Sequence, residues 1–290
     1  MSEKIIISSD STTDLSPELI ERYNIKISPL SVVMDDKVYV DGKEASPEDI
    51  YDYYARTGKL AKTAATSIGD HIDFFNEQTA DGSTLIHFTI SNSMSVNNHN
   101  AVLAAEEVNE DGKKVYIVDT KNLSTGGGLL VISAAEMAKS GMSAEEIVSE
   151  LDKIIPCVDA SFVIDDLEFL HKGGRCSAVA ALGANLLKLK PCITVKNGAM
   201  GVEKKYRGKF ADVLKIYVSE RLADADDICL DRVFVTHAGC DEEIVNAVVS
   251  QVKEALPWKE VFLTRAGCTV SAHCGRNTLG VLFIKKNPIA

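Results

Sequence analysis

The chain has 290 residues, of which 46% are hydrophobic and 25% are charged, an ordinary balance for a globular protein that is long enough for two domains. Its formal net charge of −11 argues against sequence-independent binding to DNA or RNA, which needs a basic face. No apolar run is long enough to span a bilayer, and the three apolar residues after Lys4 are too few for a signal peptide. We therefore expect a cytoplasmic protein with no stable membrane insertion.

In the first half of the chain, a short apolar strand is followed by a polar loop and then a helix three times over. Ser16-Pro17-Glu18 has the composition of a helix start, and Ser143 with Glu146 forms a capping-box pattern. This alternation is typical of a parallel α/β sheet, whose loops gather at one edge where ligands bind. The expected strands cover residues 4–8, 27–33, 38–40, 84–90 and 114–118. The expected helices cover 16–23, 69–78, 101–108 and 129–139, and two more begin at residues 46 and 143.

The pattern changes after about Cys157. Asn197-Gly198 is a strong signal for a hairpin turn, so at least one strand pair should be antiparallel. The expected strands cover residues 162–164, 192–196, 201–206, 233–236, 261–265 and 280–285, and the expected helices cover 178–189, 210–222 and 242–255. We therefore predict an N-terminal parallel-sheet α/β domain over 1–157 and a smaller C-terminal α+β domain over 158–290.

Two cations flank a pair of glycines in an otherwise acidic chain. Lys172 precedes Gly173-Gly174 and Arg175 follows them, at the end of an apolar, helix-like segment. A local basic spot on an acidic protein indicates a nearby anion, either a ligand or an acidic side chain. The alternative interpretation is a helix C-terminus, where glycine caps the chain and the helix dipole favours cations.

The chain lacks the patterns of several common sites, including the phosphate loop, the nucleophile elbow, the dinucleotide fingerprint, the EF-hand and the zinc-protease helix. What remains is a scattered set of hydroxyls and one histidine: Thr66-Ser67, Ser95 and His273. Hydroxyl and imidazole groups suit a carboxylate, because they donate hydrogen bonds without a net charge. Each also has an ordinary interpretation, as a helix cap or as a core histidine. The spacing of Cys268, His273 and Cys274 does not match a zinc site.

Taken together and in order, these segments resemble the DegV family of bacterial fatty-acid-binding proteins over essentially the whole chain. The segments that carry the resemblance are Asp10-Ser11-Thr12-Thr13-Asp14-Leu15, Pro29-Leu30, Thr66-Ser67, Ile90-Ser91 through Ser95 to Ala101, Leu170-His171-Lys172-Gly173-Gly174-Arg175, Lys190-Pro191, Thr236-His237-Ala238-Gly239 and Ala272-His273-Cys274-Gly275. The chain departs from the family pattern at Gly69, where a proline is usual, at Val96-Asn97, where Gly-Thr is usual, and at Arg276-Asn277, where Pro-Gly is usual.

The resemblance implies a two-domain α/β fold that holds a long-chain fatty acid in a buried apolar pocket. It implies a non-catalytic carrier that needs no cofactor or metal and presents the fatty acid to a separate ATP-dependent fatty acid kinase subunit. Thr66, Ser95 and His273 are implied for the carboxylate, with Ser67 as a neighbour. Arg175, with Lys172 beside it, is implied at the entrance, where it would support kinase docking or phosphoryl transfer.

Two other function classes stay open on the residues alone. The first is a serine-dependent hydrolase or acyltransferase that uses Ser95 with His273, and it would release product without a partner. The second is a regulatory or protein-interaction module, which would bind no acyl chain. If a pocket exists, the candidate lining residues are Phe162, Ile164, Phe169, Leu182, Leu186 and Ile193, although each is an ordinary core residue by composition.

Overall fold

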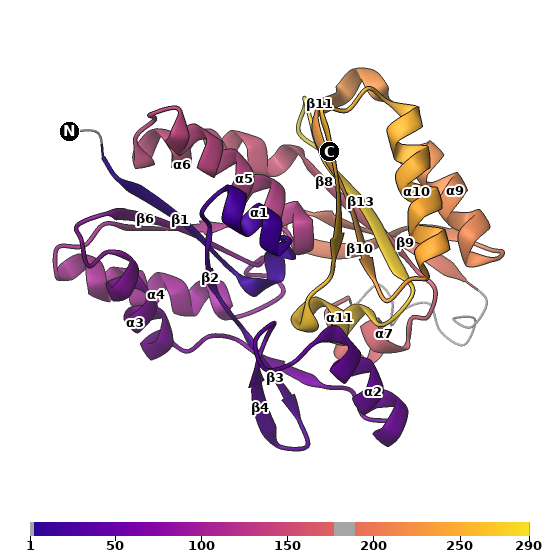
Figure 1. Ribbon diagram of the computed structural model, residues 1–290, viewed down its shortest axis with the longest axis horizontal. Coiled ribbons are helices and arrows are strands. Elements are labelled where there is room, and N and C mark those ends of the chain that lie inside the picture. The colour runs from indigo at the N-terminus through magenta and orange to yellow at the C-terminus, as the bar shows by residue number, and fades with distance from the viewer. Residues whose placement is uncertain (1–2, 177–188, 290) are drawn as a thin grey trace.

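The computed structural model describes residues 3–176 and 189–289, and its strands form three sheets (Figure 1). The parallel sheet and the separate mixed sheet confirm the predicted α/β fold class. Except for Leu189, the helix expected over 178–189 lies outside the described residues, as do the candidate lining residues Leu182 and Leu186.

The first sheet is four-stranded and wholly parallel, with the order β2-β1-β6-β7. Because its strands are parallel, their carboxyl ends meet at one edge, and polar loops follow three of them. Helices α3 and α4 lie on one face of this sheet, and α5 and α6 lie on the other (Figure 1). The elements are β1 (Ile5–Asp10), the short 3-10 helix η1 (Ser11–Thr13), α1 (Pro17–Arg22), β2 (Lys26–Ser28), α3 (Ile68–Gln78), β6 (Thr84–Thr89), α4 (Asn97–Glu110), β7 (Val115–Asp119), α5 (Ser124–Lys139) and α6 (Ala144–Ile154).

The expected strand over 27–33 is wrong as a single element, because the chain changes sheets at Pro29. Proline lacks the amide hydrogen that a sheet ladder needs, so pairing stops there. Before it, β2 belongs to the parallel sheet; after it, β3 (Ser31–Met34) is the centre of a small antiparallel sheet with the order β4-β3-β5. Its partners are β4 (Lys37–Val40) and β5 (Lys62–Ala64), and α2 (Pro47–Thr57) connects those two.

The second large sheet has six strands in the order β10-β9-β8-β13-β11-β12. Strands β11 and β12 are parallel, and the other neighbours are antiparallel. Asn197 and Gly198 both have positive φ in the turn between β9 and β10, which confirms the predicted hairpin. The elements are η2 (Ile155–Cys157), β8 (Val158–Ile164), β9 (Lys190–Lys196), β10 (Ala199–Tyr206), α9 (Phe210–Arg221), η4 (Ala225–Asp227), β11 (Ile228–Ala238), α10 (Glu242–Ala255), β12 (Glu260–Arg265) and β13 (Thr278–Lys285). The division into domains at 157/158 stays a prediction.

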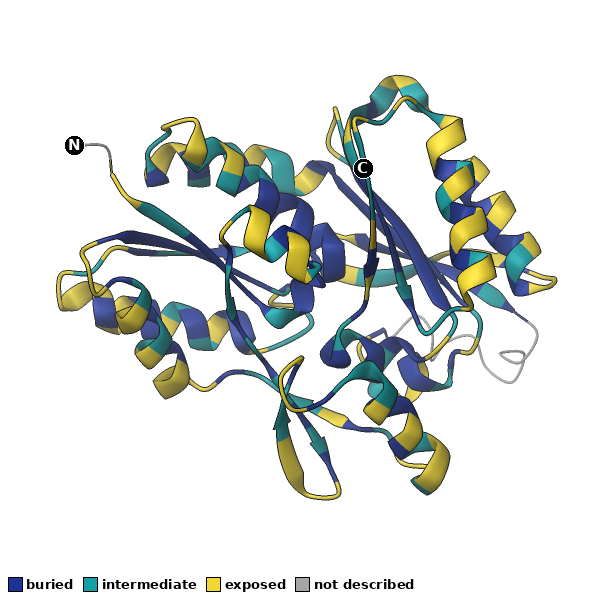
Figure 2. Cartoon of the chain, viewed as in Figure 1, coloured by how far each residue is buried: buried dark blue, intermediate teal, exposed yellow. Residues whose placement is uncertain are grey.

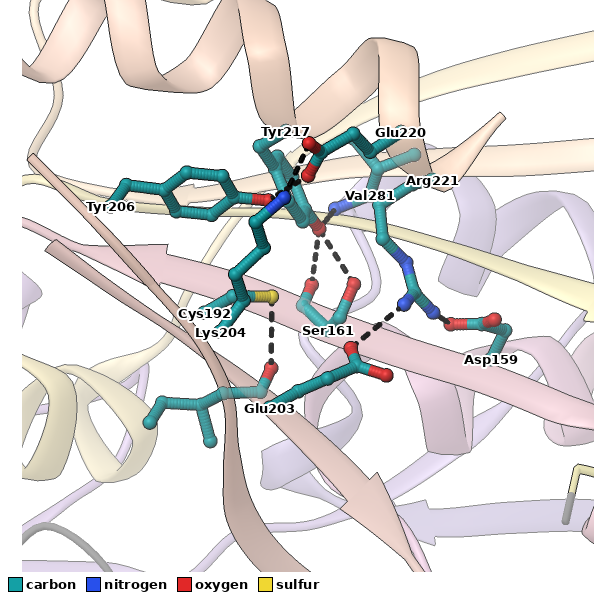
Figure 3. A network of polar contacts seen from close by, with 11 residues as sticks. Asp159, Ser161, Cys192, Glu203, Lys204, Tyr206, Tyr217, Glu220, Arg221 and Val281 are labelled. Carbon is teal, nitrogen blue, oxygen red and sulfur yellow. Dashed lines mark hydrogen bonds and ion pairs between the residues drawn. The ribbon is translucent and has the colours of Figure 1, made fainter. Parts of the chain in front are cut away.

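Helix α9 is fixed to this sheet by a polar network (Figure 3). The fully buried Tyr217 donates a hydrogen bond to the carbonyl oxygen of Ser161 at 2.8 Å and accepts one from the amide of Val281 at 3.0 Å. Arg221 pairs with the buried carboxylate of Asp159. Removing one partner of such a buried pair leaves an uncompensated charge, so the pair specifies where α9 lies on the sheet.

Helix α5 lies between the two large sheets and supplies much of their shared core. It packs against β1 and β6 on one side and against β8 and β13 on the other. Leu129, Leu130, Val131 and Ile132 are all fully buried, as expected for a helix with apolar neighbours all round (Figure 2). Within the described part of the chain, no helix combines the length and apolar character that crossing a bilayer requires.

The start of α5 differs from the prediction, because the helix begins at Ser124 and includes the three glycines that were expected to precede it. A Cβ on Gly126 would lie 2.2 Å from Oδ1 of Asn122. A Cβ on Gly128 would lie 2.9 Å from Leu15 and 3.0 Å from the carbonyl oxygen of Thr13. Glycine is therefore needed at Gly126 for the close approach of the Asn122 side chain, and at Gly128 for close packing against the chain that follows β1.

Candidate functional site

A cavity of about 410 Å³ lies between the carboxyl edge of the parallel sheet and the six-stranded sheet. This volume is in the range of sites that bind small molecules. Residues from the loop after β6, the start of α5, β8, β11, β13 and two short helices line the cavity. The two short helices are α7 (Glu168–Gly173) and α11 (Cys268–Cys274).

Most of the cavity wall is apolar. Leu123 of the loop before α5, Phe162 of β8, Leu170 of α7, Met200 of β10 and Leu282 of β13 all face it. These side chains come from segments far apart in the sequence, and the fold brings them to one place. Such a wall can exclude water from a hydrocarbon chain.

Of the described lining candidates, the structure places Phe162 in the wall and the other three elsewhere. Ile164 and Ile193 are fully buried in the core that the two large sheets share. Phe169 packs against the ring of Tyr54, with 4.7 Å between the ring centroids. The periodicity and composition of the sequence could not distinguish the cavity-wall residue from the core residues, because both kinds are equally apolar.

The charge on the cavity wall is opposite to the charge of the whole chain. Among the described residues that line the cavity, none is acidic, although the chain has 42 acidic residues. The wall contains Arg175, His237 and His273 instead. An anion would therefore meet no like charge there, and one permanent cation would attract it.

Ser95 lines the cavity and also contacts the start of α4, although the N-cap of that helix is Val96; its role toward a ligand stays a prediction. Its Oγ accepts a hydrogen bond from the amide of Asn97 at 3.2 Å, which leaves its hydroxyl hydrogen available. Val96 has φ −72°, so replacing the usual glycine with valine costs no backbone strain here. The Val96 side chain is 64% exposed next to the cavity.

Neither Thr66 nor Ser67 is among the residues that line the cavity, and the two have different surroundings. Thr66 is buried and follows Ala65, which lines the cavity, and its amide donates to Oδ1 of Asn97 at 3.1 Å. Ser67 is exposed, and its Oγ accepts from the amide of Asp70 at 3.1 Å. The helix-cap interpretation is confirmed for Ser67, which is the N-cap of α3.

His273 is the polar group at the cavity whose bonding is least complete. Its Nε2 is 2.9 Å from Oγ1 of Thr63, while its buried Nδ1 has no hydrogen-bond partner. Burial, reinforced by the positive charge of Arg175, lowers the pKa of His273 to about 4, so the ring is neutral at pH 7. The sequence analysis missed Thr63, because a three-residue strand such as β5 has too short a pattern to detect.

The basic spot after α7 divides into two cations with different roles. Gly174 has φ +69° and ends α7, which confirms the helix C-terminus interpretation. Lys172 pairs with Glu168 at 2.6 Å, on the surface of the same helix. Arg175 is exposed and lines the cavity, and its Nη1 donates to the carbonyl oxygen of Gly173 at 2.9 Å.

The short helix α11, which carries His273, is held in place by two buried aspartates: Asp14, named above only within the first segment of the family resemblance, and Asp41, which was not predicted. Asp14 accepts from the amide of Gly267 at 2.8 Å and from Oγ of Ser124 at 2.5 Å. Asp41 accepts from the amide of Cys268 at 2.9 Å. Both carboxyl groups thus accept hydrogen bonds from amides at the start of α11 that have no partner within the helix.

The contacts of Ser95 and His273 do not form a nucleophile–base pair. The hydrogen bond of His273 goes to Thr63, and that of Ser95 comes from the amide of Asn97. A triad would need a serine–imidazole hydrogen bond and a third group that orients the ring. In the described residues, no three His, Cys, Asp or Glu side chains are grouped so that they could hold a metal ion.

Comparison with known proteins gives consistent matches over the whole chain. The model of the DegV family, described as uncharacterised proteins, matches residues 4–286. A DegV domain-containing protein from Caldanaerobacter subterraneus subsp. tengcongensis is 30% identical over 284 residues, which cover 98% of this chain and 100% of the relative.

Two solved structures are similar throughout. One is a DegV family protein from Thermus thermophilus described by its fatty acid binding, with a TM-score of 0.89, 28% identity and coverage of 97% of this chain and 99% of the other. The second is a stearic acid-binding protein from Eubacterium ventriosum, with a TM-score of 0.84, 27% identity and coverage of 97% and 98%.

Proposed function

The chain belongs to the DegV family, and from this premise we propose that it binds one long-chain fatty acid in the cavity between its two large sheets. The hydrocarbon chain lies against the apolar wall, and the carboxylate lies at the end formed by Thr66, Ser95 and His273, with Ser67 as a neighbour. Under this proposal the protein is a cytoplasmic carrier and not an enzyme.

The observation that supports this proposal most is the composition of the cavity wall. It combines an apolar surface, no acidic residue among those described, and the ring of His273, which is neutral at pH 7. Burial contributes about 0.8 kcal/mol for each CH₂ group, and ordering costs offset part of this gain. The fatty acid binding described for the Thermus thermophilus protein and the stearic acid binding of the Eubacterium ventriosum protein agree with this ligand class.

The bonding of His273 allows it to act as a neutral donor to the carboxylate. Because Nδ1 is fully buried and lies against Gly173, the donor to a ligand would be an N–H on Nε2, the atom that is 2.9 Å from Oγ1 of Thr63. Ser95 has a free hydroxyl hydrogen and supplies a second donor. Two neutral donors would satisfy a carboxylate without a buried ion pair.

We also propose that the bound carboxylate is presented to a separate ATP-dependent fatty acid kinase subunit. Arg175 supports this part of the proposal, because it is exposed and at the same time lines the cavity. A guanidinium at that position can donate two hydrogen bonds at once to the oxygens of a phosphate group. Lys172 lies in the last turn of α7, just before Arg175, where it could contribute to docking through its positive charge.

The experiment that tests the ligand assignment is a titration of delipidated protein with palmitate. Ser95→Ala should weaken binding roughly fivefold, since one hydrogen bond contributes about 1 kcal/mol. Ser133→Ala is the matched control, because Ser133 donates to the carbonyl oxygen of Leu129 within α5 and does not line the cavity. Unchanged affinity of Ser95→Ala would overturn the head-group assignment, and a wild-type protein that binds no fatty acid would overturn the function.

A further inference from the structure

Asn97 connects two of the three residues that are proposed to bind the carboxylate, Thr66 and Ser95. It is fully buried at the first position of α4, although this position does not line the cavity. Its backbone amide donates to Oγ of Ser95 at 3.2 Å, and its Oδ1 accepts from the backbone amide of Thr66 at 3.1 Å. Thr66 and Ser95 lie on different loops, so a single residue fixes the distance between them.

The other end of the Asn97 amide is fixed to the parallel sheet. Its Nδ2 donates to Oδ2 of Asp10 at 2.9 Å, at the carboxyl end of β1. Asp10 is itself fully buried and accepts from Oγ1 of Thr12 at 2.6 Å and from the amide of Ile90 at 2.8 Å. Ile90 lines the cavity, so the same carboxylate also orients the loop that carries Ser95.

The orientation of the Asn97 amide follows from its neighbours. The backbone amide of Thr66 can only donate, so the oxygen of Asn97 must face it and the NH₂ group must face Asp10. His71 lies on the same side, with its Nε2 3.3 Å from Oδ1 of Asn97, where it can act as a second donor.

We propose that Asn97, held by Asp10, is a positioning residue that sets the geometry of the fatty-acid carboxylate site through Thr66 and Ser95. The inference rests on the proposed function and adds the residue that places its donors. Asn97 does not touch the ligand and acts through the two loops. A positioning role differs from general packing because loss of the Asn97 side chain should change both the protection of the Thr66 backbone amide and the affinity for the fatty acid.

Asn98 is the matched control for Asn97. It occupies the next position of the same helical turn, is 8% exposed, and uses its Nδ2 to donate to Oγ1 of Thr89 at 2.8 Å. Asn98→Ala therefore also removes a buried amide hydrogen bond, but one that contacts neither Thr66 nor Ser95. Both variants should lose stability, and only the change at position 97 should alter the carboxylate site.

The test combines palmitate titration with hydrogen exchange of the Thr66 backbone amide, measured by NMR on the full chain. Asn97→Ala should weaken palmitate binding roughly tenfold and speed exchange at Thr66, because that amide loses its acceptor. Asn98→Ala should leave both at the wild-type values. If the wild type and Asn97→Ala bind palmitate equally, the inference is overturned while the proposed function stands; if the wild type binds none, both fall.

A second variant keeps the test decisive if Asn97→Ala does not fold. Asn97→Asp preserves the size of the side chain but places a carboxylate against Asp10, and like charges repel at that distance. We expect weaker binding than wild type at pH 8, and a smaller difference from wild type at pH 5, where the new carboxyl takes up a proton and regains a donor. An affinity ratio between Asn97→Asp and wild type that stays at one across this pH range would contradict the inference.

Discussion

Gly173 and Gly174 are adjacent but needed for different physical reasons. Gly174 has φ +69°, a conformation that residues with a Cβ rarely adopt, and it ends α7. Gly173 has no such conformation; a Cβ there would instead lie 2.8 Å from Nδ1 of His273. The sequence identified the pair as a turn, but only the structure shows that Gly173 provides room for the imidazole.

The proposed role of Arg175 separates binding from transfer. Arg175→Ala should leave palmitate affinity within about twofold, because its guanidinium is largely in solvent, where charge contributes little. The same variant should lower acyl phosphate formation at least tenfold when ATP and a fatty acid kinase subunit are supplied, since it removes a cation from the transfer site. Product formation is measured as trapped acyl hydroxamate.

Arg207→Ala is the control for this prediction, because Arg207 is also exposed but does not line the cavity. Equal acyl phosphate formation by the wild type and Arg175→Ala would contradict the assigned role. Loss of the fold in Arg175→Ala, seen as a collapsed thermal transition, would instead assign Arg175 to the structure of the turn after α7.

At the scale of elements, local sequence patterns predicted the helix starts and the turn that depend on neighbouring residues. The capping box at Ser143, the proline starts of α1 and α2 and the Asn197-Gly198 hairpin all lie where the sequence placed them. Helix α11 escaped prediction because its cap is not local: Asp14 and Gly267 are 253 positions apart. The same holds for Asn97, whose partners Thr66 and Asp10 precede it by 31 and 87 positions.

The anchoring of α11 should make stability depend on pH through Asp14. Burial raises the pKa of Asp14 from 3.8 to about 8, so the folded chain holds a proton that the unfolded chain releases. Between these two values folding takes up this proton, and stability therefore falls as pH rises. Asp14→Asn should remove that slope, which is at most about 1.4 kcal/mol per pH unit for one proton.

Urea unfolding of the wild type and Asp14→Asn between pH 5 and 8 measures this effect. The variant should gain stability relative to the wild type as the pH rises across this range. Asp73→Asn, a substitution at an exposed aspartate, is the control for the change in net charge. Parallel stability profiles for the wild type and Asp14→Asn would show that Asp14 does not take up a proton on folding.

At the scale of the whole molecule, the site forms where the two large sheets meet around α5. The alternation of strands and helices predicted the parallel sheet, and the polar loops pointed to its carboxyl edge, which borders the cavity. The cavity itself could not be predicted, because its wall combines side chains such as Leu123, Phe162 and Leu282 that composition cannot distinguish from core. Its lack of acidic lining residues is likewise a property of the assembled fold.

Native mass spectrometry of the purified protein, with organic extraction of whatever is bound, tests the fatty-acid assignment most directly. We expect a fraction of the protein to carry an added mass equal to one long-chain fatty acid, and the extract to contain that acid. Protein that is empty as purified should gain the same mass after incubation with a mixture of fatty acids. A chain that is empty as purified and stays empty after that incubation would contradict the account.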